Sequence, residues 1–188
     1  MQVAVITPYY KESLDVLIRC RDSVKEQTHK DTTHILVADG HSNAICKGWN
    51  VEHFELPHSH NDAGATPRAM AAISAFSRGY DAVAFLDADN WYDSDHIERM
   101  INTVESGNVP IAIGTRRIHA IDGRELYVDT IESNGDNMVD TNTMFLTTPA
   151  LHLLSYWVVP PGQRLWSDRH FWNVVKQSKL PIGRCLKP

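Results

Sequence analysis

Continuous apolar runs alternate along the chain with segments of helical periodicity. β-branched and apolar runs predict buried strands at residues 2–7, 34–38 and 81–86, and further strands at 51–56, 109–117 and 142–147. Apolar residues three and four apart predict helices at about residues 13–27, 66–78, 94–106 and 167–178. Strands that are apolar on both faces are typical of parallel sheets covered by helices. We therefore expect an α/β fold with a mostly parallel central sheet flanked by helices.

Capping residues mark where two of these helices begin. Thr66 is a favoured N-cap residue and Pro67 suits the first helical position, so we expect a helix from there that ends at Gly79. Asp93 or Ser94 is expected to cap the next helix.

Composition narrows the class of protein. A length of 188 residues predicts one domain with a substantial core. The content of 43% hydrophobic and 22% charged residues is typical of globular proteins and argues against disorder. The formal net charge of -5 argues against nucleic-acid binding, which needs a basic surface. No run approaches the roughly 18 apolar residues of a membrane span, and the N-terminus lacks a signal-peptide pattern, so we expect a cytoplasmic protein.

The cysteines and histidines give no clear metal or disulfide pattern. Cys20, Cys46 and Cys185 are far apart and odd in number, which argues against a disulfide framework or a zinc ribbon. His58 and His60 stand in a polar segment that favours a solvated loop over a metal site.

Polar side chains follow three of the predicted strands. Thr7 and Tyr9 end the first strand, Asp39 ends the second, and Asp87 and Asp89 follow the strand at 81–86. Because the carboxyl ends of parallel strands meet at one edge, we expect these side chains to converge. Close carboxylates repel one another unless a cation lies among them, and oxygen ligands suit Mg²⁺ or Mn²⁺, which would bridge a diphosphate. The alternative is that the Asp-x-Asp pair only ends a strand and caps the next turn.

The chain contains neither a P-loop motif nor a GxGxxG motif. Phosphates bound at this edge would therefore be neutralised by a metal and not by a glycine-rich loop.

Three stretches together carry a resemblance to a known family. The sequence resembles the family 2 glycosyltransferases of the GT-A fold in VAVITPYYKE at 3–12, ILVADGHS at 35–42 and GYDAVAFLDADNWYDSDHIERM at 79–100. The match is loose beyond about residue 105. The resemblance implies a single Rossmann-like GT-A domain over residues 1–188, with a nucleotide-binding half (1–105) and an acceptor-binding half (106–188).

The resemblance also implies roles for the residues at the strand ends. Thr7 and Tyr9 would lie along the nucleotide base, and Asp39 would accept hydrogen bonds from it. Asp87 would face the ribose or the metal, and Asp89 would ligate Mn²⁺ or Mg²⁺ directly.

Arg68 matches an arginine that the family often carries on the helix before the Asp-x-Asp strand, although about one helical turn early. It either reaches the nucleotide or lies on the surface. Two positions depart from the family pattern, because Tyr10 replaces an asparagine and Ala38 replaces the first acid of an acidic pair.

The family draws its general base from an acidic motif near the end of the catalytic domain. The segment WSDRHFW at 166–172 occupies that place, with Ser167 where the family often has glutamate. The resemblance thus implies that Asp168 is the catalytic base, while the alternative is an N-cap for the last helix. His170 would be a further metal ligand.

The acceptor side is expected in the second half of the chain. Trp91 or Trp166 would line it, and Asp140 or Asn142 would touch the donor sugar. Residues 119–137, rich in Asp, Gly, Asn and Glu, are expected to form a mobile loop that closes over the donor.

These observations predict a metal-dependent inverting glycosyltransferase with a UDP- or GDP-sugar donor and a carbohydrate or lipid-linked acceptor. One alternative is a nucleotide-sugar-binding module without transfer activity. A sugar-nucleotide pyrophosphorylase is a further alternative, but it would need a glycine-rich basic loop where this chain has Lys11-Glu12-Ser13.

Overall fold

The computed structural model describes residues 1–120, 122–136, 138–158 and 166–187. Strands and helices alternate through the first half, in the order β1 (Val3–Tyr9), α1 (Leu14–Lys25), β2 (Thr32–Asp39), the 3-10 helix η1 (Ala44–Gly48), β3 (Glu52–Leu56), α2 (Ala65–Ser77), β4 (Ala82–Phe85) and α3 (His96–Gly107). The second half contains β5 (Ile111–Ile113), β6 (Arg116–His119), β7 (Glu125–Asp129), η2 (Thr141–Thr143), β8 (Met144–Thr147), η3 (Thr148–Trp157), α4 (Ser167–Gln177) and β9 (Ile182–Arg184).

Seven strands form one sheet in the order β3-β2-β1-β4-β8-β5-β9. β8 is antiparallel to both of its neighbours, and the other pairings are parallel. The α/β class and the mostly parallel sheet are therefore confirmed.

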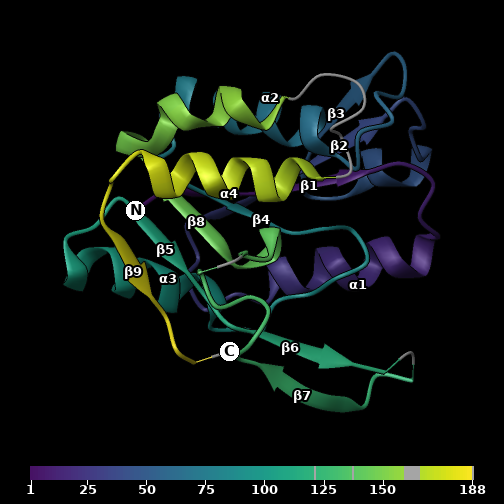
Figure 1. The fold of residues 1–188 in the computed structure, drawn as a ribbon. Coiled ribbons are helices and arrows are strands. Elements are labelled where there is room, and N and C mark those ends of the chain that lie inside the picture. The colour runs from purple at the N-terminus through teal and green to yellow at the C-terminus, as the bar shows by residue number, and fades with distance from the viewer. Residues whose placement is uncertain (121, 137, 159–165, 188) are drawn as a thin grey trace.

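Helices cover both faces of the sheet because its central strands are apolar on both sides. In β1, Ala4 and Ile6 pack into the core that contains α2, η3 and α4 residues. The alternate residues Val3 and Val5 pack with α1 and α3 residues on the other face. Figure 1 shows α2 and α4 above the sheet and α1 and α3 below it.

The region expected as one strand at 109–117 forms two strands that belong to different sheets. β5 stays in the main sheet, where it pairs with β8 and β9. After it, Gly114 donates its N–H to the Thr143 carbonyl at 2.8 Å. The chain then turns away from the main sheet, and β6 pairs with β7. β7 lies within the segment 119–137 that we expected to be a loop, so that expectation is wrong for residues 125–129. The β6–β7 hairpin stands apart from the main sheet in Figure 1.

Helix α2 begins earlier than its capping pattern predicts. Gly64 occupies the N-cap position with φ of 78°. The capping oxygen comes from Asp62, whose Oδ2 accepts hydrogen bonds from the Thr66 N–H at 3.0 Å and its hydroxyl at 2.5 Å. The expected N-cap Thr66 therefore lies inside the first turn.

Two other helix starts and one strand also differ from the expectation. Asp95 and Trp166 occupy the N-cap positions of α3 and α4, so neither Ser94 nor Asp168 is a cap. β9 was not expected, since its three residues carry too little pattern. Within the part of the chain that the structure describes, no helix has the length and hydropathy needed to cross a membrane.

Candidate functional site

A cavity of about 380 Å³ opens at the carboxyl ends of β1, β2 and β4. We call it the acidic cavity, since five carboxylates line it and Arg68 is its only lining arginine or lysine among the described residues; the carboxylates are those of Glu12, Asp39, Asp62, Asp87 and Asp89. The parallel strands deliver these side chains to one edge, as expected. A diphosphate entering this cavity would meet net negative charge, which an added cation would offset.

Arg68 reaches the cavity from the first turn of α2. Its side chain is only 5% exposed, and its Nη2 forms an ion pair with Oδ1 of Asp87. Its guanidinium also lies over the ring of Trp157, 5.4 Å from the centroid. The sequence left open whether Arg68 points into the site or lies on the surface. In the structure its side chain points into the acidic cavity.

Gly64 permits the close approach that places Arg68. A Cβ atom on Gly64 would lie 2.8 Å from Cγ of Pro8 and 3.5 Å from Nη2 of Arg68. The left-handed φ of 78° also disfavours any side chain there. The loop before α2 can therefore lie against the end of β1 only with glycine at this position.

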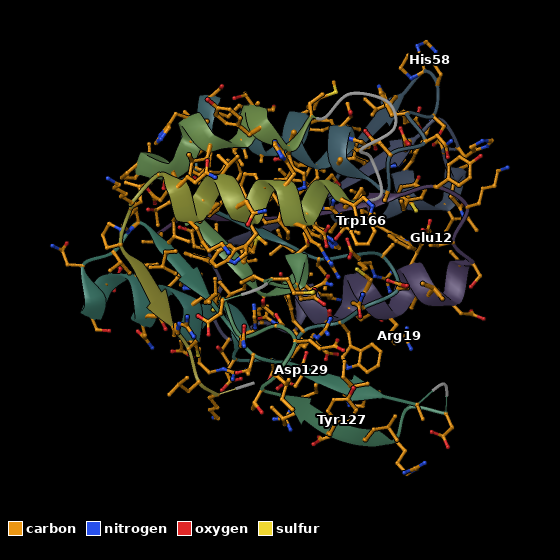
Figure 2. All side chains as sticks on the ribbon, in the orientation of Figure 1. Glu12, Arg19, His58, Tyr127, Asp129 and Trp166 are labelled. Carbon is orange, nitrogen blue, oxygen red and sulfur yellow. The ribbon has the colours of Figure 1, made fainter. Side chains whose placement is uncertain are left out.

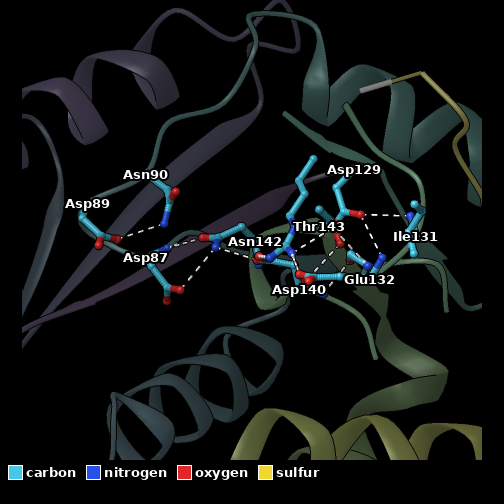
Figure 3. Close-up of polar contacts among 11 residues, drawn as sticks. Asp87, Asp89, Asn90, Asp129, Ile131, Glu132, Asp140, Asn142 and Thr143 are labelled. Carbon is cyan, nitrogen blue, oxygen red and sulfur yellow. Dashed lines mark hydrogen bonds and ion pairs between the residues drawn. The ribbon is translucent and has the colours of Figure 1, made fainter. Parts of the chain in front are cut away.

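Asn142 holds Asp87 from the opposite side to Arg68. Its Oδ1 accepts from the Asp87 backbone N–H at 2.6 Å, and its Nδ2 donates to Asp87 Oδ2 at 3.2 Å and to Asp140 Oδ1 at 2.7 Å. Figure 3 shows this row of contacts from Asp87 through Asn142 to Asp140, and beside it the separate contact of Asp89 with Asn90. The expectation that Asp140 or Asn142 touches the donor sugar stays a prediction; the structure shows Asn142 against Asp87.

The row continues into a partly buried cluster of ion pairs around Arg116, the first residue of β6. Arg116 contacts Asp140 at 2.5 Å and Asp129 at 2.8 Å. Burial of Asp129 opposes its ionisation, but backbone N–H groups of Glu132 and Ile131 and the Arg116 guanidinium outweigh it and lower the Asp129 pKa to about 2. The contact with Arg116 fixes the carboxylate of Asp140. This carboxylate accepts a hydrogen bond from the Asn142 amide and so fixes the amide as well.

Asp39 is buried at the end of β2 and is held by the loop after β3. It accepts hydrogen bonds from the Ser59 hydroxyl at 3.1 Å, the His60 N–H at 3.1 Å and the His60 ring at 2.7 Å. These contacts orient its carboxylate at the cavity wall. Gly40 allows the loop to approach, since a Cβ there would lie 2.3 Å from the Ser59 nitrogen.

Tyr9 and Thr7 occupy different environments, although both are on β1. Tyr9 lines the acidic cavity, and its hydroxyl contacts the His53 ring at 2.8 Å and accepts from the Asn43 N–H at 3.0 Å. Thr7 is fully buried under the sheet, where its hydroxyl meets His34 Nε2 at 2.9 Å. The structure therefore brings Tyr9 to the cavity but not the Thr7 side chain.

Asp89 lies at the mouth of the acidic cavity. Its backbone carbonyl accepts from Arg19 at 2.7 Å, and its carboxylate accepts from the Asn90 amide at 2.9 Å. Partial burial raises the pKa of Asp89, and the neighbouring charges of Asp87 and Glu12 raise it further.

Asp168 lies in the first turn of α4, where its Oδ1 accepts from the Arg169 N–H at 2.7 Å. It is half-buried and does not line the acidic cavity. The N-terminal end of α4 is nevertheless at the edge of the sheet where β1 ends (Figure 1), and Trp166 lies at the same end of the molecule as Glu12 in Figure 2. The segment 159–165 before it lies outside the described residues.

A smaller cavity of about 200 Å³ adjoins the Asp-x-Asp turn on the hairpin side. Trp91 lines it, with its ring 4.9 Å from that of His119 on β6. Asp140 and Asn142 also line this smaller cavity. Since Asn142 also contacts Asp87, it links this cavity to the acidic cavity.

Residues 4–155 match the model of glycosyl transferase family 2. The chain belongs to this family.

Two curated relatives are glycosyltransferases by name. Glycosyltransferase GlyA of Streptococcus pneumoniae is 29% identical over 117 residues, which are 60% of this chain and 16% of that protein. An uncharacterized glycosyltransferase of Rickettsia conorii is 27% identical over 139 residues, 70% of this chain and 22% of that protein. The chain thus spans less than two thirds of the length of either relative.

Solved structures confirm the GT-A fold of this family member. S. aureus TarS 1-349 superposes with a TM-score of 0.78 at 14% identity, over 100% of this chain and 59% of that one. Its complex with UDP has a TM-score of 0.76 at 15% identity, and its complex with UDP-GlcNAc 0.74 at 13%.

The carboxylates of this family 2 chain suit a divalent cation only when a substrate helps to bind it. Among the described residues, no three His, Cys, Asp or Glu side chains are grouped to hold a metal by themselves. Mg²⁺ usually takes one or two carboxylates and completes its shell with water and substrate phosphates. Asp87 and Asp89, with negative charge in excess around them, fit that arrangement.

Sequence analysis missed Asp62, which lines the acidic cavity. It named Asn142 but not its contact with Asp87, which lies 55 positions away in the chain. For Asp62, the spacing to Thr66 in Asp-x-x-x-Thr is a local capping signal that was available.

Proposed function

We propose that this chain transfers a glycosyl group from a nucleoside diphosphate sugar to an acceptor hydroxyl, with inversion at the anomeric carbon and with Mn²⁺ or Mg²⁺. The observation that carries the proposal is the acidic cavity, where Asp87 is fixed by Arg68 and Asn142 beside an exposed Asp89. Membership of glycosyl transferase family 2 supports the reaction class. The UDP and UDP-GlcNAc complexes of TarS support a uridine nucleotide as donor.

The cavity walls suit the two ends of such a donor. Tyr9 and Asp39 lie together on one wall, where a ring can pack on the tyrosine and a base N–H can donate to the carboxylate. Asp87 and Asp89 on the other wall would hold the cation, which supplies the positive charge that stabilises the departing diphosphate. Arg68 neutralises Asp87 and keeps its carboxylate in place.

The transfer step needs a base on the acceptor side, and we assign it to Asp168. Asp168 takes the proton of the acceptor hydroxyl while that oxygen bonds to the anomeric carbon. The bond between the anomeric carbon and the diphosphate oxygen breaks, and its electron pair leaves with the diphosphate. The position of Asp168 in the first turn of α4 supports this role, since that end of the helix lies at the edge of the sheet where β1 ends (Figure 1).

Asp168→Asn tests the proposal, because the amide keeps the shape and cannot accept the proton. UDP release from a UDP-sugar, with an acceptor or with water, should fall by roughly 10²- to 10⁴-fold. The Kd for UDP should change by less than about threefold, since Asp168 does not line the acidic cavity. Asp15→Asn is the matched control, because Asp15 also lies in the first turn of a helix.

If Asp168→Asn releases UDP as fast as Asp15→Asn, Asp168 is not the base. If the wild-type chain binds UDP-sugars but releases no UDP, the transfer proposal fails and the chain is a binding module.

A further inference from the structure

A second cavity of about 380 Å³ lies on the α1 face of the sheet. We call it the basic cavity. It is enclosed by the second half of α1, the turn after it, the start of β2 and residues 48–51 between η1 and β3. It shares no lining residue with the acidic cavity, so any ligand there leaves the donor site open.

The charge of the basic cavity is opposite to that of the donor site. Arg21, Lys25 and Lys30 line it together with His29 and His34, and no aspartate or glutamate does. Lys25 is exposed and has no ion-pair partner within the described residues, so its charge is available to a ligand. Lys30 donates to the Gln27 carbonyl at 2.9 Å, which holds its ammonium group at the cavity.

Arg21 and Trp49 form a prearranged wall. The guanidinium of Arg21 lies 4.4 Å from the centre of the Trp49 ring, and Asp22 pairs with it at 2.6 Å. Stacking and pairing hold the arginine in one position before any ligand arrives. The half-buried Trp49 adds a flat apolar surface beside the cations.

His34 is a buried polar group with one unpartnered nitrogen. Its side chain lines the cavity, the residue is only 6% exposed, and Nδ1 has no hydrogen-bond partner. Burial and the nearby Arg21 lower its pKa to about 3, so the ring is neutral near pH 7. Leaving a buried polar atom unpaired costs stability, which a ligand atom at Nδ1 would offset.

We propose that the basic cavity binds the phosphate group of a small phosphorylated molecule. A phosphate has enough charge and enough acceptor oxygens for several cations and a histidine N–H at once. In the tautomer that carries the ring proton on Nδ1, the Thr7 hydroxyl donates to Nε2 of His34 and Nδ1 is a donor for the ligand. The cavity is far larger than one phosphate needs, since a water molecule takes about 30 Å³. The remaining space beside Trp49 fits an attached sugar or other organic group.

Calorimetric titration in EDTA tests the proposal, because without a divalent cation the acidic cavity repels anions. Inorganic phosphate and glucose 6-phosphate are the probes, with glucose and matched sodium chloride as blanks. The double variant Lys25→Gln, Lys30→Gln should weaken binding of both phosphates by at least about tenfold. The control is Lys176→Gln, Lys179→Gln, which removes the same charge at the end of α4 and should leave Kd unchanged within about twofold.

The two probes distinguish the source of the phosphate. If glucose 6-phosphate binds more tightly than inorganic phosphate, and Trp49→Leu removes that difference, the ligand is an organic phosphate. If the two probes bind with equal affinity, the ligand is the free phosphate ion. Absence of saturable binding by either probe, or equal losses in the two double variants, overturns the proposal. This test does not depend on the proposed transfer reaction. The Kd for UDP with Mn²⁺ is expected to be the same in all of these variants, because none of them changes a residue that lines the acidic cavity.

Discussion

Asn142 binds Asp87 at two points, accepting from its backbone N–H at 2.6 Å and donating to its carboxylate at 3.2 Å. The same amide donates to Asp140, which Arg116 holds from the hairpin side. Arg68 contacts the other carboxylate oxygen of Asp87. The first acid of the Asp-x-Asp pair is therefore held at both of its carboxylate oxygens, while the second remains exposed.

Replacing Asn142 with alanine should lower both stability and donor affinity. The Asp87 N–H loses its partner, and an unpaired half-buried donor costs about 1–3 kcal/mol in the free energy of unfolding, measured by urea denaturation. The Asp87 carboxylate also loses one of its two supports, so the Kd for UDP with Mn²⁺ should rise. Asn90→Ala is the control, since Asn90 makes one contact to the exposed Asp89. Equal effects of the two substitutions would contradict the special role of Asn142.

Nucleotide binding should depend on a divalent cation. At a UDP concentration about 100 times its Kd, the unfolding free energy should rise by roughly 2.7 kcal/mol with Mn²⁺, and much less in EDTA, because five carboxylates line the cavity. Asp89→Asn should remove the metal-dependent part of this gain. Asp39→Ala should reduce the gain with or without metal. Thermal-shift titration measures all three, and equal stabilisation by UDP in EDTA would exclude the cation from binding.

Stability should fall on acidification below about pH 6.5, because His34 and His96 are buried as neutral rings. Burial lowers the pKa of each to about 3, with Arg21 and Arg99 adding to the effect. The unfolded chain binds protons at its ordinary value of 6.5 and the folded chain does not, so the unfolding free energy is constant above that pH and declines between about 6.5 and 3. Each histidine contributes up to about 1.4 kcal/mol per pH unit.

The test is the slope of the unfolding free energy against pH, measured between about pH 4.5 and 7.5 in wild type and in histidine variants. His34→Gln and His96→Gln should each reduce the slope, whatever they do to stability at neutral pH. His58→Gln is the control, since His58 is exposed at the tip of the loop after β3 (Figure 2). An unchanged slope in both buried variants would show that other groups take up the protons.

Gly64→Ala should destabilise the chain more than the same change at Gly79. Both residues have positive φ, of 78° and 96°, so each alanine costs about 1–2 kcal/mol of backbone strain. At Gly79 the new methyl meets nothing within 4 Å, whereas at Gly64 it lies 2.8 Å from Pro8. Gly64→Ala should also raise the Kd for UDP, because Arg68 lies beside it. Equal unfolding free energies and unchanged UDP binding would refute this account.

The local pattern of apolar and polar residues was enough to predict the central sheet of this protein and the helices that cover it. Apolar runs on both faces predict buried parallel strands, since each strand can bury both sides only between helices. The position of Asp39 and of the Asp87–Asp89 turn follows from where those runs stop, because carboxyl ends of parallel strands share one edge. The order of residues alone was therefore enough to predict the arrangement of the first half of the chain.

Contacts between distant segments decided the rest. The pairing of Arg68 with Asp87, the support of Asp87 by Asn142 and the burial of the Thr7 hydroxyl against His34 all join residues far apart in sequence, and no local signal encodes such pairings. Strand β7 formed where polar composition indicated a loop, since ion pairs from Arg116 and Arg117 of β6 stabilise the hairpin in place of an apolar core. The sequence by itself determined which edge of the sheet holds the carboxylates, and tertiary packing decided which of them is fixed and which stays open, because that depends on the partners folding brings to each one.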